Sequence, residues 1–204
     1  AYNVNVLGPK HLAKACKEHK VTLIHISTDF VFSGKASQPY PEGAKTNPIG
    51  VYGNTKLKGE NAIIETLKNH FIIRTSWLYS EFGSNFLKTM LSLAKDRETL
   101  SVVADQIGTP TYAKDLAVVI LNLISFNNQQ YGVYHYSNEG VASWYDFAKA
   151  IFEEQHISLF VTGQNNAENW HQKENKVLPH EPSPQPCHKE SVGHFWLICG
   201  QTGL

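Results

Sequence analysis

The sequence has little that would suit a secreted, membrane-spanning or nucleic-acid-binding protein. Its 204 residues include only three cysteines, at scattered spacing, which favours a reducing compartment over a disulfide framework. No apolar run approaches the ~20 residues of a membrane span, and the N-terminus shows no signal-peptide pattern. Lys plus Arg and Asp plus Glu both number 18, so there is no excess charge to attract nucleic acid or an anionic membrane. We expect a cytoplasmic protein that binds neither.

Apolar residues are plentiful, at 42% of the chain, and their spacing alternates between two patterns. Short β-branched runs predict strands, and stretches with helical periodicity lie between them. This alternation is typical of βαβ units and a mostly parallel sheet. We therefore predict an α/β fold with a Rossmann-like, doubly wound parallel sheet. The expected strands are 21–27, 71–76, 100–104 and 132–137, and the expected helices are 2–20, 51–67, 86–94, 113–124 and 144–152.

The main chemical signal is a Y-x-x-x-K pattern at the start of the helix expected over 51–67. Tyr52 and Lys56 stand at positions i and i+4, so their side chains share one helical face. A nearby ammonium favours the phenolate and lowers the pKa of a tyrosine from its ordinary value near ~10. Such a pair can act as general acid or base between an alcohol and a ketone, and the lysine can bind a ribose. The pattern also arises by chance on many helices.

Hydroxyl and carboxyl groups follow the first expected strand directly. Ser27, Thr28 and Asp29 stand at its carboxyl end, where ligands bind in open parallel sheets. The chain from there to Tyr52 is long enough to bring the two together. A hydroxyl at this position can bond the tyrosine or a substrate carbonyl, although such residues also commonly satisfy loop backbone.

Several segments occur in the order and spacing of a known family. They are STDFVFSG, P-x-G-V-Y-G-N-T-K-L-K-G-E, IIRTSWLY, NFLKTMLSLAK and DQIGTPTYAKDLA. Together they resemble the dTDP-4-dehydrorhamnose reductases, which are extended short-chain dehydrogenases/reductases. The resemblance runs from about Ala1 to about Ser158.

The resemblance implies roles for single residues. Tyr52 matches the proton donor to the sugar ketone, Lys56 the residue that holds the nicotinamide ribose, and Thr28 a residue that bonds near the reacting oxygen. The expected catalytic residues are thus Tyr52, Lys56 and Thr28, of which Tyr52 and Lys56 also bind the cofactor. The expected substrate-binding residues are Thr28, Asp29, Trp77, Asn85 and Gln106. Asn5 matches a helix asparagine of extended members, although an asparagine on a helix is usually solvated.

The implied reaction is the reduction of the C4 ketone of dTDP-4-dehydro-L-rhamnose to dTDP-L-rhamnose, a precursor of cell-surface polysaccharide. NADPH or NADH would supply the hydride, and the protein the geometry and the proton. The implied partners are a dTDP-sugar and, in a homodimer, a second copy of the chain. The family also raises Mg²⁺ as an additional ion, but the residues themselves assign no metal ligand.

Two features depart from the family pattern. The sequence has no G-x-x-G-x-x-G phosphate loop, so we expect that the first βαβ units are missing from this chain. The residues after about 159 lose their periodicity and carry clustered prolines, which predicts an irregular tail. We divide the chain into a partial dinucleotide-binding domain (1–104), a substrate-binding part with returning helices (105–158) and the tail (159–204). Cys187, His188, His194 and Cys199 in that tail match no standard zinc spacing.

Other functions stay open on this evidence. A related extended dehydrogenase, such as a sugar-nucleotide epimerase, would share Y-x-x-x-K, although Trp77 and the DQIGTPT segment favour the reductase. A non-catalytic relative that binds a partner, like the regulatory subunit of methionine adenosyltransferase, would not need Thr28, Tyr52 and Lys56 together. An inactive fragment is the third alternative, and the absent phosphate loop favours it.

Overall fold

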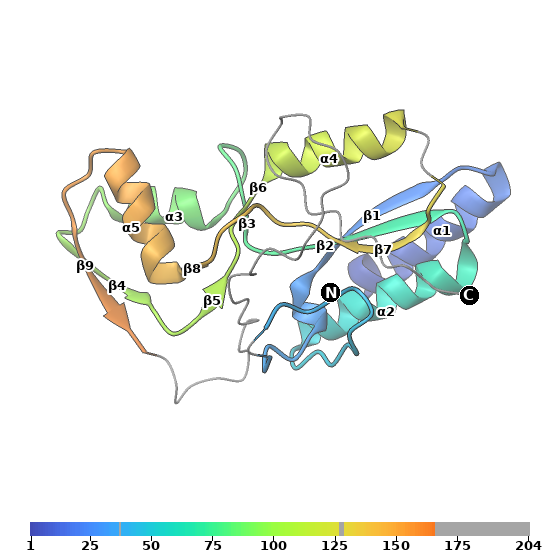
Figure 1. Ribbon diagram of the computed structural model, residues 1–204, viewed down its shortest axis with the longest axis horizontal. Coiled ribbons are helices and arrows are strands. Elements are labelled where there is room, and N and C mark those ends of the chain that lie inside the picture. Colours follow the sequence, from blue (N-terminus) through green and yellow to red (C-terminus); the bar gives the residue numbers. More distant parts are fainter. Residues whose placement is uncertain (37, 127–128, 166–204) are drawn as a thin grey trace, which may run out of the picture.

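The computed structural model describes residues 1–36, 38–126 and 129–165. Its elements gather in two groups, which we call the first and second regions (Figure 1). The first region contains a parallel sheet of order β1-β2-β7 with helices on both faces. The second region contains two short strand pairs and two helices, and the chain enters it after β2 and again after β7.

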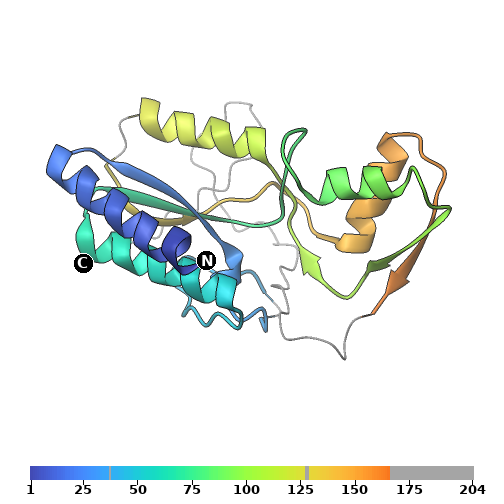
Figure 2. The same cartoon turned by 180° about the vertical axis from the view of Figure 1, so that it is seen from behind.

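The first region is a small doubly wound sheet. All its pairings are parallel, with Ile26 opposite Ile73 and Ile73 opposite Tyr134. Helices α1 and α2 cover one face and α4 covers the other, as both views show (Figures 1 and 2). Its elements are η1 (Asn3–Leu7), α1 (Gly8–His19), β1 (Leu23–Thr28), η2 (Asp29–Val31), α2 (Val51–Thr66), β2 (His70–Thr75), α4 (Ala113–Ser125) and β7 (Gly132–His135).

Strand β2 is buried on both sides, and its alternating side chains face different helices. Phe71 and Ile73 pack in a cluster with Leu116 and other residues of α4. Ile72, which lies between them, packs instead against Ile63 of α2 in the cluster beneath α1 and α2. By the same alternation, Arg74 points to the α2 side. Arginine is rarely buried without a partner, so a partner is expected there.

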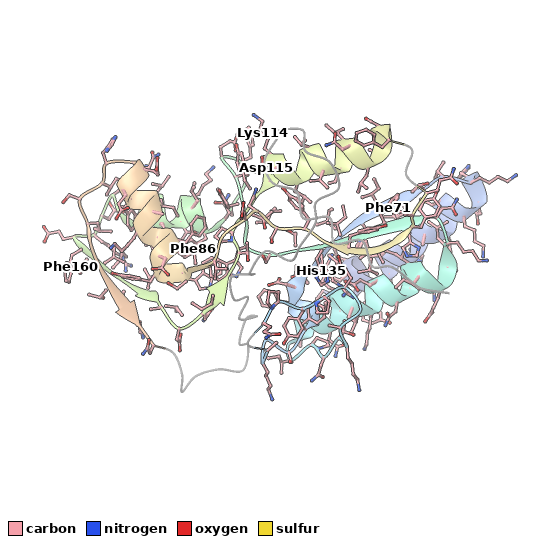
Figure 3. All side chains as sticks on the ribbon, in the orientation of Figure 1. Phe71, Phe86, Lys114, Asp115, His135 and Phe160 are labelled. Atoms are coloured by element: carbon pink, nitrogen blue, oxygen red, sulfur yellow. The ribbon has the colours of Figure 1, made fainter. Side chains whose placement is uncertain are left out.

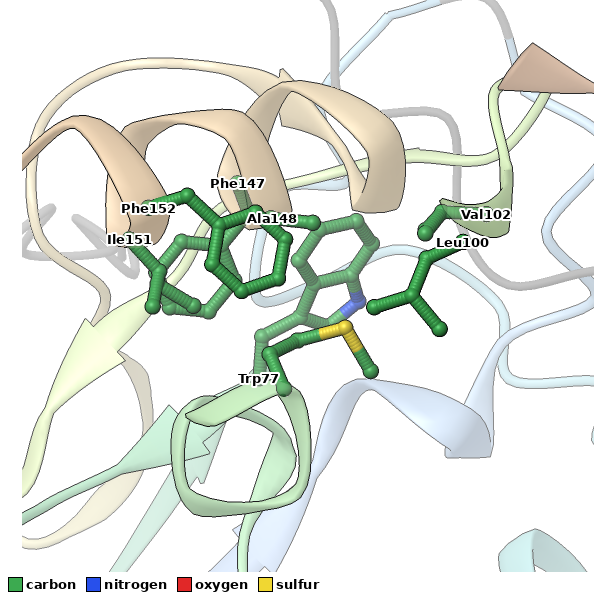
Figure 4. Packing of buried hydrophobic residues seen from close by; sticks show 8 residues of the cluster. Trp77, Leu100, Val102, Phe147, Ala148, Ile151 and Phe152 are labelled. Atoms are coloured by element: carbon green, nitrogen blue, oxygen red, sulfur yellow. The ribbon is translucent and has the colours of Figure 1, made fainter. Parts of the chain in front are cut away.

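The second region encloses an aromatic core. Trp77, Phe147 and Phe152 pack there with aliphatic side chains such as Leu100 (Figure 4). Strands β4 and β9 are parallel, β5 and β8 are antiparallel, and a third pair, β3 and β6, lies where the chain passes between the regions. The elements are β3 (Leu78–Tyr79), α3 (Phe86–Leu93), β4 (Thr99–Val103), β5 (Ile107–Gly108), β6 (Thr111–Tyr112), β8 (Ala142–Ser143), α5 (Trp144–Glu154) and β9 (Phe160–Gln164).

The α/β fold with a parallel, Rossmann-like sheet is confirmed, and the long elements lie where the sequence predicted them. The irregular tail is corrected at its start, because residues 160–164 form β9 against β4. Pairing with β4 orders this segment although its own sequence lacks a clear pattern. The rest of the tail, with Cys187, His188, His194 and Cys199, lies outside the described residues.

The divisions at residues 104 and 158 stay a prediction, although two pairings cross them. β7 joins the sheet of the first region, and β9 joins β4.

Within the described ranges, no helix is long and apolar enough to cross a membrane.

Candidate active site

The candidate site lies where the carboxyl end of β1 meets the first turn of α2. Thr28 is the last residue of β1 and is buried. Its hydroxyl oxygen accepts a hydrogen bond from the backbone N–H of Phe30 (3.2 Å), which caps η2. The same hydroxyl lies 3.0 Å from a carboxylate oxygen of Asp29, to which it can donate. This local capping fixes the Thr28 side chain at the end of the sheet.

Tyr52 reaches this hydroxyl from α2. Its ring stands edge-on to Phe30 with centroids 5.7 Å apart, which places the phenol close to the Thr28 hydroxyl. Tyr52 is 48% exposed, so part of the residue is open to a ligand. Thr28 and Tyr52, predicted together from the sequence, are thus brought into contact.

The pKa of Tyr52 is raised above its ordinary value, which corrects the expectation that Lys56 lowers it. Burial is the largest cause because it disfavours the phenolate, and the Asp29 charge acts in the same direction. The hydrogen bond from Thr28 opposes both. The phenol is therefore protonated at neutral pH, which is the form that a proton donor needs.

Lys56 lies one turn further along α2 and is held by β1. Its ammonium donates to the carbonyl oxygen of Ile26 (2.6 Å) and lies 3.4 Å from Nε2 of His25. Burial lowers the pKa of Lys56, and the nearby Glu60 carboxylate raises it. The pKa of His25 is lowered to about 4 by burial and by the Lys56 charge, so its neutral imidazole accepts from the ammonium.

A buried ion pair lies beneath these residues and was not foreseen. The Glu60 carboxylate, 0% exposed, accepts from Nη2 of Arg74 at 2.7 Å and from the hydroxyl of Ser27. Arg74 Nη1 lies 3.4 Å from Nε2 of His135, which is labelled in Figure 3 beside the sheet. The i, i+4, i+8 spacing of Tyr52, Lys56 and Glu60 could have indicated Glu60. Arg74 and His135 emerge only from the register of the sheet.

Asn5 is half-buried, which corrects the expectation that an asparagine on this helix is solvated. Its side-chain amide donates to the Thr55 hydroxyl of α2 at 3.1 Å. A Cβ added at Gly59 would stand only 2.1 Å from the backbone oxygen of Asn5, so the two segments are in close contact. Asn5 therefore helps to pack η1 closely against α2.

The other expected substrate residues lie in or beside the second region. Trp77 is 8% exposed and stacks on Trp144 with centroids 3.5 Å apart. Gln106 accepts a hydrogen bond from Nε1 of Trp144 at 2.9 Å. Asn85 caps α3, because its side-chain oxygen accepts from the backbone N–H of Lys88. Each of these contacts is structural, and the roles of the three residues toward a substrate stay predictions.

Trp77 nevertheless has two features that simple packing does not require. Its φ of +46° lies in the left-handed region, which is costly for a residue with a large side chain. Its indole N–H is buried with no hydrogen-bond partner within the described part of the chain. A site of strain and an unused donor thus lie at the junction between β2 and β3.

A metal centre finds no support in the part of the chain that the structure describes. It contains no group of three or more His, Cys, Asp or Glu residues that could hold an ion. The Mg²⁺ suggested by the family resemblance therefore has no such group of ligands among these residues.

Comparison with known proteins gives the family. The model of the family described as "RmlD substrate binding domain" matches residues 1–187. The chain belongs to this family. A dTDP-4-dehydrorhamnose reductase of Aggregatibacter actinomycetemcomitans is 47% identical over 158 residues, which are 76% of this chain and 54% of that protein. The spore coat polysaccharide biosynthesis protein SpsK of Bacillus subtilis is 46% identical over 161 residues, 79% of this chain and 56% of that protein.

A solved structure agrees with this assignment. The crystal structure of dTDP-4-dehydrorhamnose reductase from Bacillus anthracis in complex with NADP superposes with a TM-score of 0.83 at 42% identity. The match covers 89% of this chain and 64% of that chain. The chain thus spans about half the length of the curated relatives it matches and under two thirds of this structure.

The residues present fit one end of a nicotinamide cofactor. An ammonium has three N–H groups, of which Lys56 directs one to Ile26 and one toward His25, so a third remains for a ribose hydroxyl. Tyr52 and Thr28 lie beside it, at the strand end where dinucleotides bind in such folds. The Gly-rich loop that would hold the pyrophosphate is absent from the sequence.

Proposed function

We propose that the protein takes part in the NAD(P)H-dependent reduction of the C4 ketone of dTDP-4-dehydro-L-rhamnose to dTDP-L-rhamnose, a precursor of cell-surface polysaccharide. The observation that carries the proposal is the position of the Tyr52 phenol at the carboxyl end of β1 beside Thr28, with Lys56 one helical turn away and held by the carbonyl oxygen of Ile26. Relatives named for this reaction, at 47% and 45% identity, support the choice of substrate. The NADP-bound relative from Bacillus anthracis supports the choice of cofactor.

The chain's own residues would act on the ketone oxygen. NAD(P)H, when bound, supplies the hydride that reduces the carbonyl carbon. Thr28 and Tyr52 would hold the carbonyl oxygen by hydrogen bonds, and Tyr52 would give its phenolic proton to that oxygen as the alcohol forms. Lys56 would bind the ribose and stabilise the phenolate that remains. The homodimer and the cytoplasmic location remain predictions.

Tyr52→Phe tests the proton donor. It removes the transferable proton and keeps the ring, so turnover of dTDP-4-dehydro-L-rhamnose should fall by ~10²-fold or more. The loss of NADPH absorbance measures turnover, and fluorescence measures NADPH affinity, which should change little. Tyr131→Phe is the matched control, because the Tyr131 hydroxyl lies 3.5 Å from that of Thr22 and its ring packs on Phe71, at the far end of the sheet. Equal turnover in Tyr52→Phe and in the unchanged protein would refute the assignment.

A cofactor titration tests whether this chain itself holds a nicotinamide. NADPH is added, and energy transfer from tryptophan to the nicotinamide is recorded. Saturable binding that weakens in Lys56→Met is the expected result. Binding that Lys56→Met leaves unchanged would mean that the ribose contact lies elsewhere.

A further inference from the structure

The face of α2 that carries Tyr52 and Lys56 continues by one more turn to Glu60. The three side chains meet the end of β1 and the turn that follows it: Tyr52 lies edge-on to Phe30, Lys56 donates to the carbonyl oxygen of Ile26, and Glu60 accepts from Ser27. Contacts at three successive turns allow only one register of the helix along the strand. We call this set of contacts the α2 ladder.

The last contact of the ladder is the most buried. Glu60 is 0% exposed and Arg74 is 7% exposed. Nε of Arg74 lies 3.1 Å from one carboxylate oxygen and Nη2 lies 2.7 Å from the other, which is a bidentate pair. Replacing such a pair by apolar side chains is often neutral for stability, because both charges must first be desolvated. Stability alone therefore does not account for it.

Arg74 is itself fixed from two other elements. Its guanidinium lies 5.1 Å above the ring of Phe32, which follows η2. Nδ1 of His135 lies 3.0 Å from the carbonyl oxygen of Tyr40, so Nδ1 carries the hydrogen and Nε2 can accept from Arg74. Glu60 is thus attached through Arg74 to β2, β7 and the loop after η2.

We propose that Glu60 is a positioning residue for Tyr52 and Lys56, because it fixes the register of α2 on the sheet by holding Ser27 and Arg74. The inference rests on the proposed function of Tyr52 and Lys56. The Glu60 charge adds a second effect, since it raises the pKa of Lys56 against the effect of burial. Without Glu60, the lysine would more easily lose its proton, and Tyr52 would be free to move away from Thr28.

Glu60→Gln tests the inference, because it keeps the size and removes the charge. NMR of ¹³C-labelled lysine and tyrosine follows both titrations, with Lys56→Met and Tyr52→Phe assigning the signals. We expect the pKa of Lys56 to fall and that of Tyr52 to rise as its bond to Thr28 loosens. We also expect kcat to drop by ~10-fold or more with little change in KM. Glu60→Asp, which keeps the charge, should restore the pKa of Lys56 in part.

Ile63→Val is the matched control. Ile63 lies on the same helix and is also 0% exposed, but it packs only in the apolar cluster. It should cost some stability and leave both titrations unchanged. If Glu60→Gln loses stability and likewise leaves both titrations unchanged, Glu60 is structural only and the inference is wrong.

Ser27→Ala tests the positioning role of Glu60 if Glu60→Gln does not fold. It removes the contact between Ser27 and Glu60 and keeps the ion pair between Glu60 and Arg74. The pKa of Tyr52 should rise in this variant too, and an unchanged titration would overturn the inference. A different outcome would separate the two proposals. If the variants shift both titrations but the unchanged protein does not reduce a dTDP-sugar, the positioning role of Glu60 is supported and the proposed function is refuted.

Discussion

The two regions of the molecule bury different kinds of side chain. On the α2 side of the β1-β2-β7 sheet, the first region buries a carboxylate and a guanidinium, and two half-buried imidazoles lie beside them and Lys56. The core of the second region is formed by stacked aromatic and aliphatic side chains around Trp77. A polar interior costs desolvation but allows few alternative arrangements, whereas an apolar cluster tolerates repacking. The difference indicates that accurate placement matters most in the first region.

Arg74→Met should cause the largest loss of stability, because it disrupts the polar interior of the first region. It leaves the fully buried Glu60 carboxylate without its partner, which typically costs about 3–5 kcal/mol of unfolding free energy. Denaturant unfolding measures the loss. The double variant Glu60→Leu with Arg74→Met should recover most of the stability but not the turnover. A loss below about 1 kcal/mol in the single variant would show that the polar interior is not tightly coupled.

The pH dependence of stability should come mainly from two half-buried histidines of the first region, His25 and His135. The pKa of His25 is lowered to about 4 by burial and Lys56, and that of His135 to about 4 by burial and Arg74, from 6.5. Between pH 6.5 and 4 the unfolded chain binds protons that the folded chain does not, so stability is full above 6.5 and falls toward 4. Each histidine contributes at most about 3 kcal/mol.

Matched variants separate the two histidines. His25→Gln and His135→Gln should each flatten the curve of stability against pH, as measured by unfolding at several pH values. Only His25→Gln should also alter the titration of Lys56, because His135 faces Arg74 instead. A curve that keeps its full slope in both variants would contradict the account.

Gly108→Ala should have a smaller effect, confined to the second region. The new Cβ would stand 2.4 Å from the ring of Trp77, which is stacked on Trp144 and cannot easily move. Overpacking of this kind costs about 1–3 kcal/mol. Near-ultraviolet circular dichroism should report the disturbed tryptophan pair, while the pKa of Tyr52 should not change. A shift of that pKa would mean that the regions are coupled more closely than described.

The sequence predicted the long elements because their apolar periodicity was strong. It missed the two-residue strands β3, β5, β6 and β8, and also β9, because pairing between distant segments creates them. Thr28, Tyr52 and Lys56 were predicted together from their positions at a strand end and a helix start. Arg74 and His135 were not, because only the register of β2 and β7 brings them to the α2 side.

The electrostatic expectation for Tyr52 failed for a physical reason. The spacing of Tyr52 and Lys56 indicates proximity, but it does not say where the ammonium points. In the fold, Lys56 donates to the carbonyl oxygen of Ile26, and burial dominates the pKa of the phenol.

The central claim is that the Tyr52 phenol is protonated at neutral pH and bonded to Thr28, ready to donate. The most direct test is a ¹³C NMR titration of Tyr52 in the unchanged protein and in Thr28→Val. We predict a pKa above 10 in the unchanged protein and a higher one in Thr28→Val, which lacks the hydrogen bond that lowers it. A pKa near neutral pH, or one that Thr28→Val leaves unchanged, would contradict the claim.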